Sequence, residues 1–217
     1  MELYDVMRTT GAVRQFTGEP LPDDVLARIL DNARFAPSGG NRQGTRIVVV
    51  RDPATRQRLA EFTVPGAKRY LAQRANGESP WNPLAPCGVD DATVEAVDAT
   101  PMGQPLLDAD VVLVVWLDLG VAAAFDQDLG RVGVVSGASV YPFVWNVLLA
   151  ARNEGFGGVL TTMAVPREAD VRELLGVPDR FALAAEVPLG KPAHQVRSLT
   201  RKPVGELATR ERFDGAL

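Results

Sequence analysis

Residues 136–153 constrain the fold most, because a helix of this length would carry apolar side chains on every side. Apolar residues occupy most of its positions: Ala138, Val140, Tyr141, Phe143, Val144, Trp145, Val147, Leu148, Leu149 and Ala151. A helix without a polar face must be buried all round. It therefore lies either wholly inside the protein or at a surface that another subunit covers, and the residue pattern leaves both arrangements open.

Helical and strand patterns alternate along the rest of the chain, without repeats or low-complexity tracts. Apolar and β-branched runs predict strands at residues 46–50, 110–117 and 181–188. Helices are predicted at residues 3–8, 53–62 and 166–175, and a further amphipathic helix begins near Pro22 and is ended by Pro37. We therefore expect one α+β domain over residues 1–217, with a central mixed sheet surrounded by helices.

Composition and charge narrow the class of protein. With 217 residues, of which 46% are hydrophobic, the chain can bury a sizeable core. Its single cysteine, Cys87, permits no intrachain disulfide and no cysteine-ligated metal cluster. A net charge of -4 argues against nucleic acid as a partner. Neither a signal sequence nor a membrane-spanning apolar stretch is recognisable, so we expect a cytoplasmic protein without a membrane partner.

Residues 36–44, with the sequence Ala-Pro-Ser-Gly-Gly-Asn-Arg-Gln-Gly, predict a loop rich in hydrogen-bonding groups. Gly39 and Gly40 allow backbone angles closed to other residues, while Asn41 and Gln43 each offer amide donors and an acceptor. Such a loop can hold a polar planar ligand. Taken alone, the segment is more simply explained as an ordinary turn.

Three further segments occur in a fixed order around this loop. They are Arg14-Gln15-Phe16, residues 155–162 (Gly-Phe-Gly-Gly-Val-Leu-Thr-Thr), and residues 188–192 followed by 201–204. Together with the loop, their order and spacing resemble the FMN-dependent nitroreductase family over nearly the whole chain. The resemblance implies a nitroreductase-like fold and an intertwined homodimer, with a long helix at the interface and FMN bound between the subunits.

The resemblance also assigns roles to residues. Arg14 corresponds to a basic position at the flavin, near the ribityl chain and the N1/O2 edge. The implied cofactor-binding residues are Arg14, Pro37, Ser38, Gly39, Asn41, Gln43, Leu160, Thr161, Thr162, Arg201 and Lys202. Among them, residues 37–43 contact the flavin across the subunit boundary, the backbone of residues 159–162 faces N5 and O4, and Arg201 and Lys202 lie near the phosphate. Without the resemblance, Arg14 is a surface arginine and Arg201 and Lys202 belong to a solvated tail.

Two features depart from the family pattern or lie outside it. Many members carry Arg-x-Ser where this chain has Thr10-Gly11-Ala12, so a cation and a hydroxyl near the phosphate are missing. Arg8, Arg42 or Arg197 could compensate for that loss. Residues 65–104 have no counterpart that we recognise. We expect them to form a variable cover over the flavin, with Trp81 as a substrate-contacting residue, although a surface excursion without a role is equally plain.

Other chemistries find little support. His194 is the single histidine and has no neighbouring pattern of zinc ligands or of a catalytic triad. The acidic residues Asp90, Asp91 and Glu95 suit a solvated loop better than a metal site. We therefore predict no metal and no catalytic side chain, because in a flavoenzyme the cofactor performs the chemistry.

The expected function is that of an FMN-dependent oxidoreductase. It would transfer electrons from NADH or NADPH, by ping-pong kinetics, to a small organic acceptor such as a nitroaromatic, quinone or enone. The alternative is a protein that binds flavin for storage, sequestration or redox sensing, with little turnover. Specialised chemistry on the same fold, such as reductive dehalogenation or flavin cleavage, is a third interpretation, and the acceptor cannot be read from the sequence.

Overall fold

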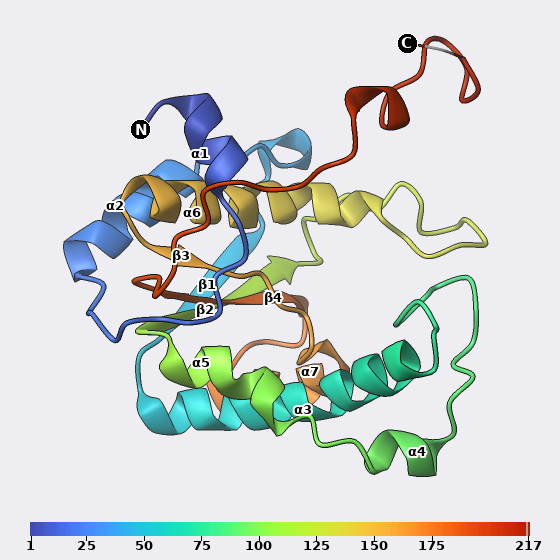
Figure 1. Ribbon diagram of the computed structural model, residues 1–217, viewed down its shortest axis with the longest axis horizontal. Coiled ribbons are helices and arrows are strands. Elements are labelled where there is room, and N and C mark those ends of the chain that lie inside the picture. Colours follow the sequence, from blue (N-terminus) through green and yellow to red (C-terminus); the bar gives the residue numbers. More distant parts are fainter. Residues whose placement is uncertain (216) are drawn as a thin grey trace.

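A computed structural model describes residues 1–215 and 217 of the chain (Figure 1). Its helices are α1 (Leu3–Thr9), α2 (Asp23–Ala33), α3 (Pro53–Ala75), α4 (Asp91–Glu95), α5 (Gln104–Asp108), α6 (Tyr141–Asn153) and α7 (Glu168–Leu175). Its strands are β1 (Thr45–Val50), β2 (Val111–Asp118), β3 (Gly157–Gly158) and β4 (Phe181–Gly190). The helices predicted near residues 3, 23, 53 and 166 and the three predicted strands are all present, so the expected α+β class is confirmed.

The strands form one sheet in the order β1-β2-β4-β3. Val48 pairs with Val114, and Val114 pairs with Glu186 on its other side. Every pairing among the described strands is antiparallel, so the expectation of a mixed sheet was wrong. The reason is that all eight residues of β2 are buried. A strand covered on both faces loses the alternation of polar and apolar residues, and its sequence then carries no sign of strand direction.

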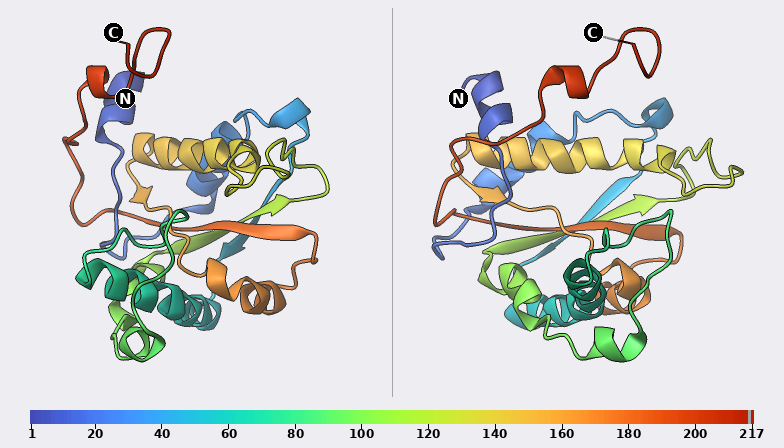
Figure 2. Two further views of the ribbon diagram at one scale, coloured as in Figure 1. Left: turned by 90° about the vertical axis from the view of Figure 1, so that its right-hand side faces the viewer. Right: turned by 45° about the vertical axis from the view of Figure 1, so that its right-hand side comes forward.

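Helices cover both faces of the sheet, which makes three layers (Figures 1 and 2). On one face, α2 and α6 pack over apolar side chains of β2 and β4, chiefly Leu113, Val115, Ala185, Val187 and Leu189. On the opposite face, α3, α5 and α7 pack over Val112, Val114, Trp116, Phe181 and Leu183. The two faces of the central strands thus hold two separate apolar clusters. Each large apolar side chain that is fully buried contributes roughly 1.5–3 kcal/mol to the stability of the fold.

Helix α6 is not enclosed on all sides within one chain. Within one chain its inner side is buried through Val144, Val147 and Ala151, while the side chains of Tyr141 and Trp145 are 43% and 42% exposed. The helix is thus not wholly internal. It also begins later than expected, because a 3-10 turn spans Val135–Ser139 and the α-helix starts at Tyr141. Pro142 is consistent with this start, since the first turn is where a helix accommodates proline without losing a hydrogen bond.

Two other helix ends differ from expectation. Helix α2 ends at Ala33, before Pro37. Helix α3 does not end near Phe62 but runs through Pro65 to Ala75. A proline inside a helix removes one backbone hydrogen bond, and here buried apolar side chains on both sides of it, Leu59, Phe62 and Ala67 among them, offset that loss. The first part of the expected cover is therefore helical.

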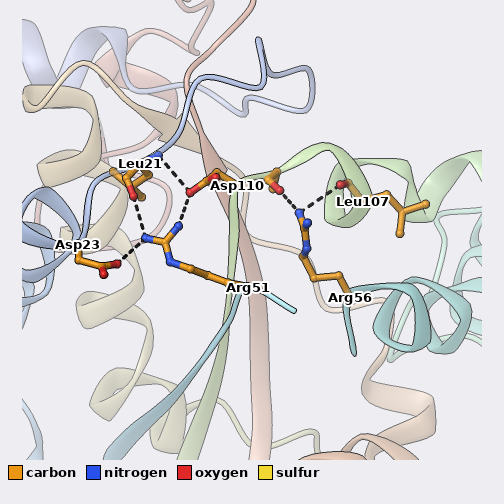
Figure 3. Close-up of polar contacts among 7 residues, drawn as sticks. Leu21, Asp23, Arg51, Arg56, Leu107 and Asp110 are labelled. Carbon is orange, nitrogen blue, oxygen red and sulfur yellow. Dashed lines mark hydrogen bonds and ion pairs between the residues drawn. The ribbon is translucent and has the colours of Figure 1, made fainter. Parts of the chain in front are cut away.

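Arginines at the end of β1 and the start of α3 tie the layers together (Figure 3). Arg51 forms an ion pair with Asp110, and its Nη2 donates to the Leu21 carbonyl oxygen at 2.7 Å. The Leu21 N–H in turn donates to Asp110 at 3.1 Å. Arg56 donates to the carbonyl oxygens of Leu107, at 3.2 Å, and Ala109. These contacts fix the start of α2 and the turn between α5 and β2 against one corner of the sheet.

Candidate functional site

A cavity of about 630 Å³ lies between the second half of α3, the segments around Trp81 and Met102, the start of α6 and the chain that follows β3. Its lining includes Arg14, Gly66, Tyr70, Pro80, Trp81, Met102, Tyr141, Leu160, Thr161, Thr162 and Ala184. Five residues singled out from the sequence thus share one cavity: Arg14, Trp81, Leu160, Thr161 and Thr162. The size is that of a typical small-molecule or cofactor site.

The wall formed by residues 159–162 is held by the sheet. The N–H of Thr161 donates to the Glu186 carbonyl oxygen and the N–H of Glu186 donates back, both at 2.9 Å. The preceding glycine allows a close approach, because a Cβ on Gly158 would clash with the Pro188 carbonyl oxygen. Backbone groups point alternately to either side of an extended chain. Accordingly, the N–H groups of Leu160 and Thr162 donate to no acceptor within the described residues and remain available beside the cavity.

Arg14 reaches the cavity from an extended segment that runs beside the ends of β3 and β4. The N–H of Val13 donates to the Gly158 carbonyl oxygen at 2.9 Å, and Phe16 pairs with Pro192. The side chain of Arg14 is exposed and makes no ion pair or hydrogen bond in the part of the chain described. It lines both the main cavity and an adjacent hollow of about 280 Å³, which also includes Ala12 and His194. An unpaired cation at this edge suits an anionic or electron-rich ligand group.

Trp81 forms the outer wall in an unusual backbone conformation. Its φ of 54° is in the left-handed region, which is a rare setting for a bulky residue. Two hydrogen bonds hold it there: its backbone N–H donates to Gln73 Oε1 at 3.0 Å, and its Nε1 donates to the Gly66 carbonyl oxygen at 3.2 Å. The Arg69 guanidinium lies 4.1 Å from the ring centroid. The indole is therefore fixed at the cavity, with its polar atom already bonded.

Gln73 is the buried residue behind this wall. It is 1% exposed, and its Nε2 donates to Glu78 Oε2 at 2.9 Å while its Oε1 accepts from Trp81. Glu78 also accepts from the side chain of Asn76 at 2.8 Å, and its pKa is lowered chiefly by the hydrogen bond from Gln73. Sequence reasoning missed Gln73, because a polar residue near a helix end is ordinarily exposed and nothing nearby marks it as buried.

Glu186 is the second buried polar residue that the sequence analysis missed. Its side chain is 1% exposed, and neither carboxyl oxygen has a hydrogen-bond partner among the described residues. Burial raises the pKa of this carboxyl to about 8, an effect that the nearby Thr63 hydroxyl opposes. The group is therefore largely protonated at neutral pH, directly behind the wall at Thr161. A signal for it exists, since Glu186 is the single charge in the apolar run 181–188.

Other residues singled out from the sequence lie outside this cavity. Pro37, Ser38, Gly39, Asn41 and Gln43 form a turn after α2, and none of them lines the cavity. Ser38 Oγ accepts from the Gln43 N–H at 2.9 Å, and the Gly39 N–H donates to Ser139 Oγ at 3.1 Å. Arg201 and Lys202 lie on the C-terminal segment, which leaves the body of the protein along α6 (Figure 1).

Neither a metal-binding cluster nor a membrane-spanning helix occurs among the described residues. Among the residues that the structure describes, no group of three or more His, Cys, Asp or Glu side chains is arranged to hold a metal ion. No helix in the same part of the chain is long and apolar enough to cross a membrane. The candidate site is the cavity with Arg14 at its edge, where residues predicted from the sequence meet.

Comparison with known proteins gives consistent matches. Residues 7–191 match the family described as the nitroreductase family. An NADH dehydrogenase of Thermus thermophilus is 29% identical over 202 residues, which cover 89% of this chain and 88% of that protein. An iodotyrosine deiodinase of Nematostella vectensis is 28% identical over 210 residues, covering 95% and 74%. The structure of an NADPH:FMN oxidoreductase from Vibrio harveyi superposes with a TM-score of 0.70 at 20% identity, covering 99% and 79%, and shows a shared fold.

Proposed function

The chain belongs to the nitroreductase family, and we propose that it is an FMN-dependent oxidoreductase that passes electrons from NADH or NADPH to a small organic acceptor. The observation that carries this proposal is the apolar cavity. Among the described residues, its lining includes the unpaired Arg14 and the backbone N–H groups of Leu160 and Thr162, which have no acceptor. Relatives named as an NADH dehydrogenase and an NADPH:FMN oxidoreductase support the same interpretation.

The chemical groups that line the cavity fit those of FMN. A flavin ring has one polar edge and two apolar faces, and it binds where donors meet the edge and apolar groups cover a face. Leu160 and Thr162 offer N–H donors, and Arg14 offers a cation. When bound, FMN supplies reversible hydride chemistry that none of the lining side chains offers. With FMN bound, Arg14 would stabilise negative charge on the reduced ring, and the apolar walls would keep water from the reacting atoms.

We further propose that the protein is a homodimer in which the turn at residues 37–43 completes the cavity of the partner subunit. Two observations support this. The turn presents exposed polar groups yet lies outside the cavity of its own chain. Large apolar side chains are exposed on the face that carries α1 and α6, including Leu3 at 65%, Tyr4 at 69% and Trp145 at 42%. An exposed apolar surface of this kind favours association.

Residues 1–217 are proposed to form one domain, in which residues 65–104 cover the cavity and Trp81 contacts the acceptor. The acceptor class follows from the lining. Arg14 is the single charged side chain among the described residues that line the cavity. A zwitterionic halotyrosine would leave its ammonium group unpaired there, at a cost in binding. We therefore favour uncharged aromatic acceptors, such as nitroaromatics and quinones, over the substrate that the name of the Nematostella relative implies.

Two measurements test the proposed function. Purified protein should show the absorbance bands of an oxidised flavin, and mixing with NADH or NADPH without oxygen should bleach them rapidly in a stopped-flow instrument. Bleaching followed by recovery with a quinone supports ping-pong turnover. A flavin-loaded protein that neither nucleotide reduces would instead support a storage, sequestration or sensing role, which the absence of the family cation at Thr10 slightly favours.

A further inference from the structure

Three separate hollows lie along residues 10–14, from the main cavity to the C-terminal end of α6. The cavity and the adjacent 280 Å³ hollow share Arg14 in their linings. That hollow and a third, much smaller one share Val13. The third is lined by Thr10, Gly11, Arg152 and Gln195, among others. The segment of residues 10–14 therefore runs from the edge of the main cavity, at Arg14, to the neighbourhood of Arg152, at Thr10.

Thr10 cannot itself bind an anion there. Its side chain is 5% exposed, and its hydroxyl donates to the Val6 carbonyl oxygen at 2.7 Å. Gly11 offers no side chain, and a Cβ at this position would lie 3.0 Å from Val196. The segment that carries a cation and a hydroxyl in many relatives is therefore sterically closed and uncharged in this chain.

Arg152 lies beside this segment with an unbalanced charge. Its Nε donates to Thr9 Oγ1 at 3.2 Å, which fixes the side chain against the first helix. The residue is half-buried and has no carboxylate within ion-pair distance among the described residues. Its two terminal nitrogens have no hydrogen-bond partner there and are not sealed in the interior. A guanidinium that is held in place at Nε and keeps two accessible nitrogens can bind an anion supplied by a ligand.

A role as a helix cap does not account for these contacts. Arg152 occupies the last turn of α6, where a cation interacts favourably with the helix dipole. However, the last carbonyl groups of the helix are already bonded, since Ala150 and Ala151 accept from the N–H groups of Glu154 and Phe156. The guanidinium is instead turned toward Thr9, away from these carbonyl groups.

We propose that Arg152 binds the phosphate of FMN and supplies the cation that is missing at Thr10. This inference rests on the proposed function, because it assumes that FMN is the ligand. The three cations suggested by the sequence fit less well. Arg42 donates to the Val121 carbonyl oxygen on the turn outside the cavity, Arg8 lies 6.0 Å from the ring of Tyr4, and Arg197 is exposed with no contact that holds it in the described part of the chain.

The test compares FMN with riboflavin, which lacks the phosphate. Both are titrated into full-length apoprotein, and binding is followed by quenching of flavin fluorescence. Arg152→Met should weaken FMN binding roughly ten- to hundredfold and leave riboflavin binding unchanged, because a single charge-assisted contact is lost. Arg152→Lys should restore part of the FMN affinity. Arg74→Met is the matched control, since Arg74 is an exposed arginine in the last turn of another helix, α3, on the far side of the sheet.

Each outcome has a distinct meaning. Wild-type protein that binds neither flavin overturns the proposed function itself. If wild-type protein binds FMN but Arg152→Met lowers the affinities for FMN and riboflavin equally, Arg152 is structural and this inference fails. It also fails if FMN affinity is unchanged. Should Arg152→Met not fold, Arg152→Gln retains a donor for Thr9 while removing the charge, and the same comparison applies.

Discussion

Replacing Glu186 by glutamine should remove a large part of the pH dependence of folding stability between pH 5 and pH 9. The carboxyl group of Glu186 is buried behind the cavity wall, and both of its oxygens lack hydrogen-bond partners among the described residues. Burial raises its pKa from 4.5 to about 8. Glutamine has nearly the same shape but does not titrate, so the variant isolates the ionisation of this one group.

The sign and size follow from proton linkage. Between the two pKa values the folded chain keeps a proton that the unfolded chain has released, so raising the pH favours unfolding. The stabilising effect of the protonated group is complete below about pH 4.5 and is lost as the pH rises to about 8. Each pH unit in this window lowers the free energy of unfolding by about 1.4 kcal/mol. From pH 5 to pH 9, the free energy of unfolding of the wild-type protein should fall by about 4 kcal/mol more than that of Glu186→Gln.

Urea unfolding followed by circular dichroism measures this difference, at one protein concentration and at several pH values. The free energy of unfolding of Glu186→Gln, minus that of the wild type, should rise steadily with pH. Glu173→Gln is the matched control, because Glu173 is exposed on α7 and makes no ion pair within the described residues. A constant difference between wild type and Glu186→Gln across the whole range would refute the reasoning and show that Glu186 titrates normally.

Three further predictions concern the cofactor, the cover and assembly. Arg14→Ala should weaken FMN binding by about tenfold or more and lower the flavin reduction potential, as measured by fluorescence titration and by equilibration with a reference dye; unchanged values would place another cation at the ring. Trp81→Ala should change the ratio of kcat/KM for a nitroaromatic and a quinone on the order of tenfold at unchanged FMN content, whereas equal losses for both acceptors would make Trp81 structural. Sedimentation at low protein concentration should show a dimer, and a stable flavin-loaded monomer would contradict the proposed cross-subunit turn.

Local sequence patterns were sufficient for most of the helices and strands, whereas grouping the cavity residues required the family resemblance. Helices α1 and α2 and strands β1, β2 and β4 appeared where periodicity and apolar runs placed them. Arg14 and residues 160–162 were predicted to act together although they are far apart in the sequence. The structure brings them to one cavity because the segment at Val13 pairs with Gly158, and the family resemblance could reveal that pairing where periodicity could not.

Contacts between distant parts of the chain account for what the sequence did not reveal. Gln73 and Glu186 are polar residues whose burial depends on what packs over them, namely the chain around Trp81 and helix α3. Strand direction was likewise hidden, because burial of β2 on both faces removed its alternation. Arg152 was overlooked for a related reason. In the sequence it is one charge at the end of an apolar helix. Only the structure shows that its guanidinium contacts Thr9 and pairs with no carboxylate among the described residues.

The turn at residues 37–43 shows why a local backbone conformation can be predicted from the sequence while its place in a site cannot. Gly40, Asn41 and Gln43 all adopt left-handed backbone angles, with φ of 60°, 52° and 51°. Glycine and asparagine tolerate this region, so the local sequence favours the turn whatever lies around it. Its position is a separate matter, fixed by the Gly39 contact to Ser139 at the start of the α6 region. The turn is therefore preformed on the face that carries α6, and we propose that a second subunit docked on that face receives its polar groups at a cavity.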